Sequence, residues 1–295
     1  MGYGYWTRES FEHYSKTMGR TVNAHGGLDA ALTDRQLFQQ KGLHSSLNPA
    51  NVIRECCDTP EHPESLPVIL ALDVTGSMGS AAAEVARKLN EVMTLLYEQV
   101  KDVEFMVMGI GDLAYDHAPI QISQFESDIR IAEQLDRIYL EHGGGGNNYE
   151  SYTAAWYMGL YHTRLDCWKR NKKGLIITMG DETLNPYLPK ASLMQATGDQ
   201  LEANVETKVL YPQAAEKFSI YHLHVSHTAT DPYQEKVKAT FGELLPKNHL
   251  RFVRVDTIAQ TIVDIVKEHA KTQNSIWHTA FLPPQQEKKN KLIFW

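Results

Sequence analysis

The chain has 295 residues, of which 42% are hydrophobic and 22% charged, with 19 glycines and 12 prolines. This composition is close to the globular average and excludes a wholly disordered, collagen-like or coiled-coil chain. Aspartate and glutamate number 36 against 29 lysines and arginines, which gives a formal net charge of -7. The charge disfavours a general role in coating nucleic-acid phosphates and is compatible with binding a cation or a neutral partner.

The cysteines and the N-terminal sequence indicate a reducing compartment. Cys56, Cys57 and Cys167 are too few for a disulfide framework, and the sequence has no Cys-x-x-Cys pair. The first residues lack the apolar segment of a signal peptide, and no stretch reaches the ~18 uninterrupted apolar residues of a membrane helix. We therefore expect a cytoplasmic protein that does not enter a membrane.

The first residues, 1–66, form a polar N-terminal extension with helical fragments such as residues 33–40. The pattern then changes, because residues 68–72 form a continuous apolar run that ends at Asp73, as in a buried parallel strand. A helix is expected next, since apolar residues recur at spacings of three and four in the segment that contains Val85, Leu89, Val92, Met93 and Leu96.

Strands and helices continue to alternate up to residue 270. Further strands are expected at residues 103–110, 119–125, 174–179, 218–225 and 250–255, and helices at residues 129–140, 149–162, 234–244 and from 258 onward. Six strands alternating with helices over residues 67–270 predict a doubly wound α/β fold, with a mostly parallel six-stranded sheet and helices on both faces. Residues 271–295 read as a polar C-terminal tail.

Polar residues follow several of these strands. Asp73-Val-Thr75-Gly-Ser77 places a carboxylate and two hydroxyls at alternate positions, which point the same way in an extended segment. Gly180-Asp181 follows a later strand, and a loop of four glycines, 143–146, leads into Asn147 and Asn148. Doubly wound sheets place their sites at the carboxyl ends of strands. Oxygen donors that include few carboxylates suit a hard cation such as Mg²⁺ or Mn²⁺.

The Asp73-x-Thr75-x-Ser77 motif, the glycine-rich loop and Asp181 together resemble the metal-ion-dependent adhesion site (MIDAS) of von Willebrand factor type A (VWA) domains, in a form close to intracellular bacterial or phage members. The resemblance implies that Thr75 and Ser77 ligate Mg²⁺, or Mn²⁺ or Ca²⁺, directly. Asp73 and Asp181 would act mainly through water. The family has a threonine in the glycine-rich loop, and here Asn147 occupies the matching place.

What the resemblance implies about function is protein interaction without catalysis. In such domains a partner protein supplies an Asp or Glu that completes the shell of the cation, and intracellular members often act as adaptors or scaffolds with ATPases or other machinery. We therefore expect a metal-dependent interaction module that binds neither nucleic acid nor membranes.

An enzymatic alternative stays open from the sequence alone. The segment that begins at Asp73 also resembles the nucleophile loop of haloacid-dehalogenase-like phosphohydrolases, with Asp181 in their Mg²⁺-binding motif and Lys172 or Lys173 as the required cation. Against this reading, Thr75 stands where the phosphatases carry a general acid. A nucleotide site is also disfavoured, because no Gly-Lys-Ser/Thr follows the glycines.

Two further groups of residues allow two interpretations each. His222, His224 and His227 suggest a zinc cluster, but the third histidine falls on the other face of the strand, so structural histidines are favoured. Asp112 and Asp116 either line the same strand-end face as Asp73 or cap the loop before Pro119.

Overall fold

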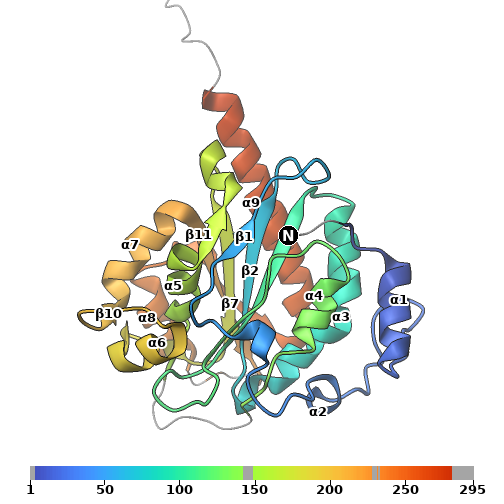
Figure 1. Ribbon diagram of the computed structural model, residues 1–295, viewed down its shortest axis with the longest axis horizontal. Helices are drawn as coiled ribbons and strands as arrows, with labels where there is room; N and C mark the ends of the chain where they lie inside the picture. Colours follow the sequence, from blue (N-terminus) through green and yellow to red (C-terminus); the bar gives the residue numbers. More distant parts are fainter. Residues whose placement is uncertain (1–3, 142–148, 228–230, 232, 281–295) are drawn as a thin grey trace, which may run out of the picture.

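The structure, a computed structural model, describes residues 4–141, 149–227, 231 and 233–280. Its centre is one six-stranded sheet (Figure 1), as the apolar runs predicted. The six strands lie at the expected places: β2 (Leu66–Asp73), β3 (Val103–Ile110), β4 (Ile120–Ile122), β7 (Gly174–Gly180), β11 (Phe218–Ser226) and β12 (Leu250–Arg254). The predicted α/β fold class is therefore confirmed.

The strand order places the first strand in the middle of the sheet. The order is β12-β11-β7-β2-β3-β4, with β4 antiparallel to β3 and every other pair parallel. The chain first builds outward from β2 to β3 and β4, and then crosses to the other side of β2 to form β7. Such a reversal leaves a crevice outside the carboxyl ends of the two strands that flank it, here β2 and β7.

Helices cover both faces of the sheet (Figure 1). One face carries α3 (Gly79–Tyr97), α4 (Arg130–Leu135) and α9 (Ile258–Ala280). The other carries α5 (Thr153–Tyr161), α6 (Lys190–Thr197), α7 (Thr207–Lys217) and α8 (Gln234–Gly242). No helix among the described residues is both long and apolar enough to cross a membrane.

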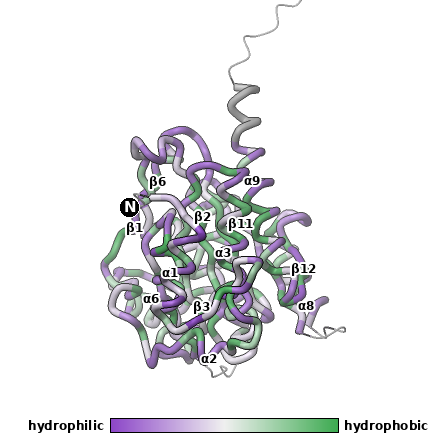
Figure 2. Tube along the Cα trace, turned by 90° about the vertical axis from the view of Figure 1, so that its right-hand side faces the viewer, coloured by the Kyte–Doolittle hydropathy of each residue, from purple (hydrophilic) through white to green (hydrophobic). Residues whose placement is uncertain are grey.

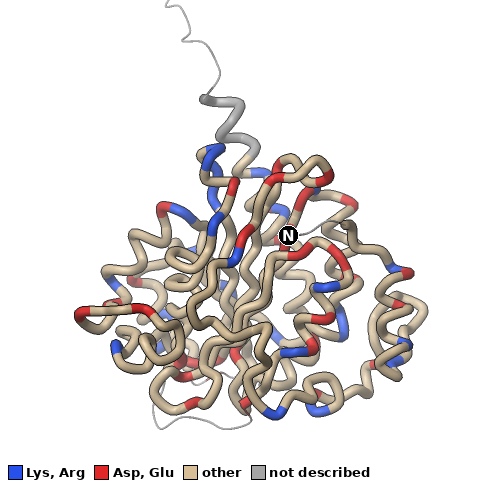
Figure 3. The backbone as a smooth tube through the Cα atoms, viewed as in Figure 1, with Lys and Arg blue, Asp and Glu red and all other residues tan. Residues whose placement is uncertain are grey.

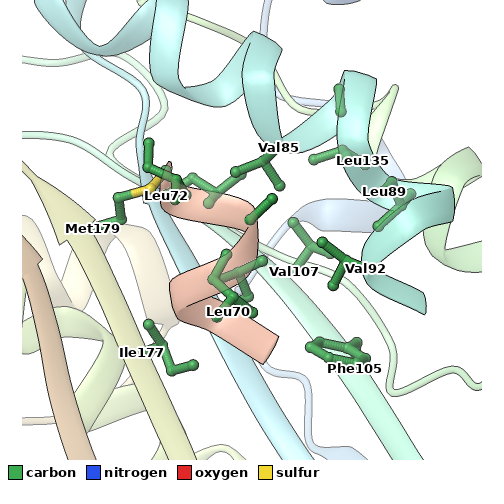
Figure 4. Close-up of a cluster of buried hydrophobic side chains, with 14 of the residues drawn as sticks. Leu70, Leu72, Val85, Leu89, Val92, Phe105, Val107, Leu135, Ile177 and Met179 are labelled. Carbon is green, nitrogen blue, oxygen red and sulfur yellow. The ribbon is translucent and has the colours of Figure 1, made fainter. Parts of the chain in front are cut away.

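The two faces of the sheet have separate hydrophobic cores, since neighbouring strand residues point to opposite sides. Leu70 and Leu72 of β2 pack with Val85 and Leu89 of α3, as Figure 4 shows, whereas Ile69 joins the core on the other face. Apolar residues are concentrated along the inner strands and the outer loops are mostly hydrophilic (Figure 2). This double burial explains why the strands read as continuous apolar runs.

The N-terminal extension packs against α3 and adds to its core. It contains α1 (Arg8–Thr17), α2 (Asp34–Leu37) and β1 (Arg54–Cys56), and β1 pairs in parallel with β6 (Thr163–Leu165). Trp6, Phe11 and Leu37 are buried in the same cluster as the apolar face of α3. A buried ion pair of 2.8 Å joins Arg20 to Asp136, next to α4.

Three helical boundaries differ from those predicted. The helix expected at residues 129–140 ends at Leu135, because the side chain of Gln121 binds the backbone N–H and C=O of Tyr139 at 2.9 and 2.8 Å. The helix expected from residue 149 starts at Thr153, since β5 (Tyr149–Glu150) pairs with β8 (Thr183–Leu184). The last helix continues to Ala280, beyond residue 271, at which the tail was expected to begin.

The helices α6 and α7 and the small strands β9 (Tyr187–Leu188) and β10 (Val205–Glu206) were not predicted. Only Leu193 and Thr197 of α6 are buried, and α7 contains Pro212 in its interior. Short helices with so few buried positions show no clear apolar period in sequence, and an internal proline disfavours a helical reading.

Asn90 holds the extension to α3 and provides a test of this packing. Its side-chain oxygen accepts from the Trp6 ring N–H at 2.8 Å and its amide donates to the Gly26 carbonyl at 3.0 Å. Asn90→Leu leaves both buried groups unpaired, so we expect the free energy of unfolding to fall by about 2–4 kcal/mol in urea titrations. Thr94→Leu, at an exposed position of the same helix, is the control and should change it by less than about 0.5 kcal/mol. Equal effects would contradict the role of Asn90.

Candidate functional site

Asp73 and Asp181 lie at the carboxyl edge of the sheet, where the strand order reverses. Asp73 is the last residue of β2, and Asp181 follows the last residue of β7. Leu72 pairs with Met179 in the sheet, so Asp73 lies beside Gly180 at the next position. The carboxyl ends of the strands lie at the lower edge of the molecule in Figure 3, and acidic residues appear on the loops there. The structure thus brings together two residues that are 108 positions apart in the sequence.

The carboxylate of Asp73 is fully buried and accepts hydrogen bonds at both oxygens. Oδ1 accepts from the backbone N–H of Thr75 at 2.9 Å and from its hydroxyl at 2.6 Å. Oδ2 accepts from the hydroxyl of Tyr152 at 2.8 Å. Because the Thr75 hydroxyl gives its hydrogen to Asp73, its oxygen lone pairs remain available to a ligand.

Tyr152 is the residue of this site that sequence reasoning missed. It comes from the turn that precedes α5, is fully buried, and also accepts the backbone N–H of Glu182 at 3.2 Å. A Cβ on residue 180 would lie 1.9 Å from its hydroxyl oxygen, so only glycine leaves room for it. The sequence does contain a tyrosine shortly after the glycine loop and a glycine before Asp181. Their contact, however, depends on how the strands align in the folded sheet.

Ser77 lies at the surface of the same edge. It is exposed in the 3-10 turn η2 (Gly76–Met78), which leads directly into α3. At the start of α3, a Cβ on residue 79 would lie 2.6 Å from a carboxylate oxygen of Asp34, so the N-terminal extension also reaches this edge. Sequence analysis named Ser77 but not Asp34. Asn147 and Asn148, the expected replacements for the loop threonine, lie outside the described residues.

Four acidic side chains gather at the carboxyl edge: Asp73, Glu150, Asp181 and Glu182, called here the site carboxylates. Burial, with a smaller contribution from the charge of Asp181, raises the pKa of Asp73 to about 7. Burial, followed by the charge of Asp73, raises the pKa of Glu150 to about 10. The pKa of Glu182 is also raised, by burial and by Asp181. These shifts arise because burial removes water from the carboxylates and because neighbouring carboxylates repel one another.

No Lys or Arg among the described residues forms a salt bridge with a site carboxylate, although the charge of Lys236 partly offsets the rise in the pKa of Glu182. Within the described ranges, the one ion pair joins Asp181 to His227 at 3.5 Å. One oxygen each of Glu150, Asp181 and Glu182 is buried and accepts no hydrogen bond. Uncompensated oxygens and a hydroxyl with available lone pairs fit a small hard divalent cation.

The described part of the chain contains no group of three or more His, Cys, Asp or Glu side chains placed to hold a metal ion. The predicted ligand set draws only Asp73 and Asp181 from those residue types, and its other described members are the hydroxyls of Thr75 and Ser77. A site of this kind therefore depends on hydroxyl oxygens.

Asp112 and Asp116 satisfy both interpretations that the sequence left open. An oxygen of Asp116 accepts the backbone N–H of Asp112 at 2.7 Å, and Asp112 accepts that of Ala114 at 2.7 Å, so both organise the loop after β3. Their charges also raise the pKa of Glu150, which places them on the same edge.

Of the three histidines, His222 and His224 lie within β11, whereas His227 follows the strand and contacts Asp181 at 3.5 Å. His222 and His224 are fully buried. His222 shares a hydrogen bond with the hydroxyl of Thr178 at 2.9 Å and stacks on Phe241, with ring centroids 3.9 Å apart. His224 pairs with Asp231. Burial holds the pKa of His222 well below its usual range. The three cysteines are free thiols.

The phosphohydrolase reading gains no support from this geometry. A nucleophilic carboxylate must reach the phosphorus of its substrate. The side chain of Asp73 is instead enclosed, with both oxygens engaged by Thr75 and Tyr152.

Glu150 provides a test of the repulsion at the site. With a folded-state pKa of about 10, it keeps its proton at pH 8, whereas the unfolded chain loses it above its ordinary pKa. The folded state therefore binds more protons between these values, and stability falls as pH rises. In EDTA, we expect Glu150→Gln to gain up to about 1.4 kcal/mol relative to wild type for each pH unit from 5 to 8. Urea titrations measure this, with exposed Glu206→Gln as control, and parallel pH profiles for wild type and Glu150→Gln would contradict it.

No protein-family model and no curated protein sequence matches the chain. Similar solved structures include the pilus adhesin SpaC from Lactobacillus rhamnosus GG in its open conformation, at 12% identity and a TM-score of 0.47 over 76% of this chain. The match spans only 31% of the SpaC chain.

In two further structures the match spans almost the whole of the other chain. The vWF domain of the type V pilus tip protein Mfa5 from Porphyromonas gingivalis has 13% identity and a TM-score of 0.42, over 70% of this chain and 95% of that one. The conserved hypothetical protein BatB from Bacteroides thetaiotaomicron has 15% identity and a TM-score of 0.41, over 70% of this chain and 100% of that one. These similarities are low, and the fold described above rests on strand order and register.

Proposed function

We propose that this protein is a divalent-metal-dependent interaction module, an adaptor or scaffold. It would hold a cation at the carboxyl edge of the sheet, and an Asp or Glu of a partner protein would complete the coordination shell of that cation. Thr75 and Ser77 would hold Mg²⁺, or Mn²⁺ or Ca²⁺, through their hydroxyls. Asp73 and Asp181 would act mainly through water. Asn147 would offer its amide oxygen.

The observation that carries the proposal is the group of site carboxylates without a compensating Lys or Arg within 4 Å among the described residues. Gathering buried carboxylates costs free energy unless positive charge offsets their repulsion. A protein that needed only a stable fold at this edge would be better served by apolar or amide side chains. The retained charge therefore supports a cation site.

The residues of the site divide this work between them. Asp73 orients the Thr75 hydroxyl by accepting its hydrogen, and Tyr152 holds Asp73 in turn through the space that Gly180 leaves. Ser77 is exposed and Asp181 is partly exposed, so this part of the carboxyl edge is open to a second protein. When bound, a divalent cation supplies the positive charge that attracts the carboxylate of a partner.

The charge of the edge gives the metal a controlling role. Without a cation, the partly exposed carboxylate of Asp181 repels an approaching Asp or Glu. With the cation in place, the sign of the interaction is reversed. Partner binding would therefore require the metal, while the protein itself carries out no chemical step.

A first test measures metal binding by thermal unfolding. We expect Mg²⁺ at ten times its dissociation constant to stabilise the folded state by about 1.4 kcal/mol, which raises the midpoint of a protein of this size by about 2–4 °C. Ser77→Ala should lose most of this increase, and Ser80→Ala, an exposed serine three residues away, should keep it. Mn²⁺ and Ca²⁺ are compared in the same assay. If neither variant loses the Mg²⁺-dependent increase in the unfolding midpoint, or if both lose it equally, the assigned ligands are wrong.

A second test measures partner capture from an extract of the source cells, with and without EDTA. We expect wild-type protein to retain a partner, for example an ATPase or another component of cellular machinery, only in Mg²⁺, and Asp73→Asn to lose it while remaining folded. The bound protein is then mutated at its own Asp and Glu residues to find the one that completes the site. A partner held equally well in EDTA would exclude the metal-dependent mechanism.

A further inference from the structure

A cavity lies at the opposite edge of the sheet, where the parallel strands begin. It has a volume of about 570 Å³ and is bounded by residues 63–66 at the start of β2, by residues 99–102 before β3 and by residues 267–273 in the middle of α9. The eight residues of β2 separate it from Asp73, a distance of ~25 Å at the rise of an extended strand. This cavity is thus independent of the proposed metal site.

Four lysines line this cavity: Lys101, Lys172, Lys267 and Lys271. Its two acidic residues are already engaged. Glu64 forms an ion pair with Lys172 at 2.8 Å, and the carboxylate of Asp102 faces His62 at 3.4 Å and accepts the backbone N–H of residue 64 at 3.3 Å.

The other three lysines, Lys101, Lys267 and Lys271, have no carboxylate within 4 Å in the ranges that the structure describes. They come from two segments far apart in the sequence, the loop before β3 and helix α9. Like charges that converge on one cavity repel each other unless an anion lies between them. Their convergence is the charge pattern of an anion-binding site.

Apolar groups form part of the wall. Leu66 and Val100 are buried residues with relative exposures of 8% each, and Ala270 adds a third apolar contact from α9. A cavity of several hundred cubic ångströms, with apolar walls and a few convergent charged groups, is typical of sites for small organic ligands. A bare inorganic ion would leave most of this space empty.

We propose that this cavity binds a small organic anion, with an apolar body against Leu66, Val100 and Ala270 and an anionic head, carboxylate or phosphate, between Lys101, Lys267 and Lys271. Lysine ammonium groups bind both kinds of head as point charges. The half-buried Lys267 and the exposed Lys271 lie four residues apart, on one side of α9.

The test uses 1-anilinonaphthalene-8-sulfonate, an aromatic anion whose fluorescence reports binding. We expect saturable binding to wild type and a dissociation constant at least tenfold higher for Lys267→Ala/Lys271→Ala, whereas the arginine pair at the same positions keeps the affinity. Lys101→Glu, at an exposed residue, should weaken binding by reversing a charge without disturbing packing.

The matched control is Lys236→Ala/Lys238→Ala, which removes two exposed lysines from α8. Displacement of the probe by octanoate identifies a carboxylate ligand, and displacement by phenyl phosphate identifies a phosphate ligand. Equal affinity of wild type and the Lys267/Lys271 variant, or an equal loss in the α8 control, would overturn the proposal. Urea titrations of each variant check that it is folded.

Discussion

The geometry of the carboxyl edge depends on how the buried carboxylate of Asp73 is held. Its three hydrogen bonds come from Thr75, two residues further along the same strand end, and from Tyr152, 79 residues away. The local bonds set the direction of the Thr75 hydroxyl. The long-range bond joins β2 to the turn before α5, and the same tyrosine hydroxyl reaches the backbone after β7 through the N–H of Glu182. Three segments of the chain are thereby held in one arrangement.

The strand order explains why this arrangement arises at β2 and β7. The two strands lie side by side and in parallel, but the chain forms β3 and β4 between them in sequence. Their loops leave the sheet on different sides, and a doubly wound sheet places its binding sites at such a reversal. The amino ends of the same strands carry the lysine-lined cavity. The site carboxylates and the lysine-lined cavity therefore lie at opposite edges of one sheet.

Much of this architecture could be predicted from local sequence patterns. The six strands of the sheet are buried on both faces and read as apolar runs, and the spacing of Asp73, Thr75 and Ser77 follows from one extended segment. Contacts across the fold could not be predicted in this way. Tyr152 reaches Asp73 only because Gly180 has no side chain, and α4 ends early because Gln121 binds a backbone 18 residues ahead. Both effects require the sheet register, which no local pattern contains.

The packing of the N-terminal extension also bears on how the chain folds during synthesis. Trp6 and Arg20 leave the ribosome first, yet their partners, Asn90 and Asp136, follow 84 and 116 residues later. The same core also needs Ile258 and Ile262 of α9, near the other end of the chain. The extension therefore has no docking surface until α3 and α4 have emerged. The apolar face of α3 is closed only when translation of the whole sheet is complete.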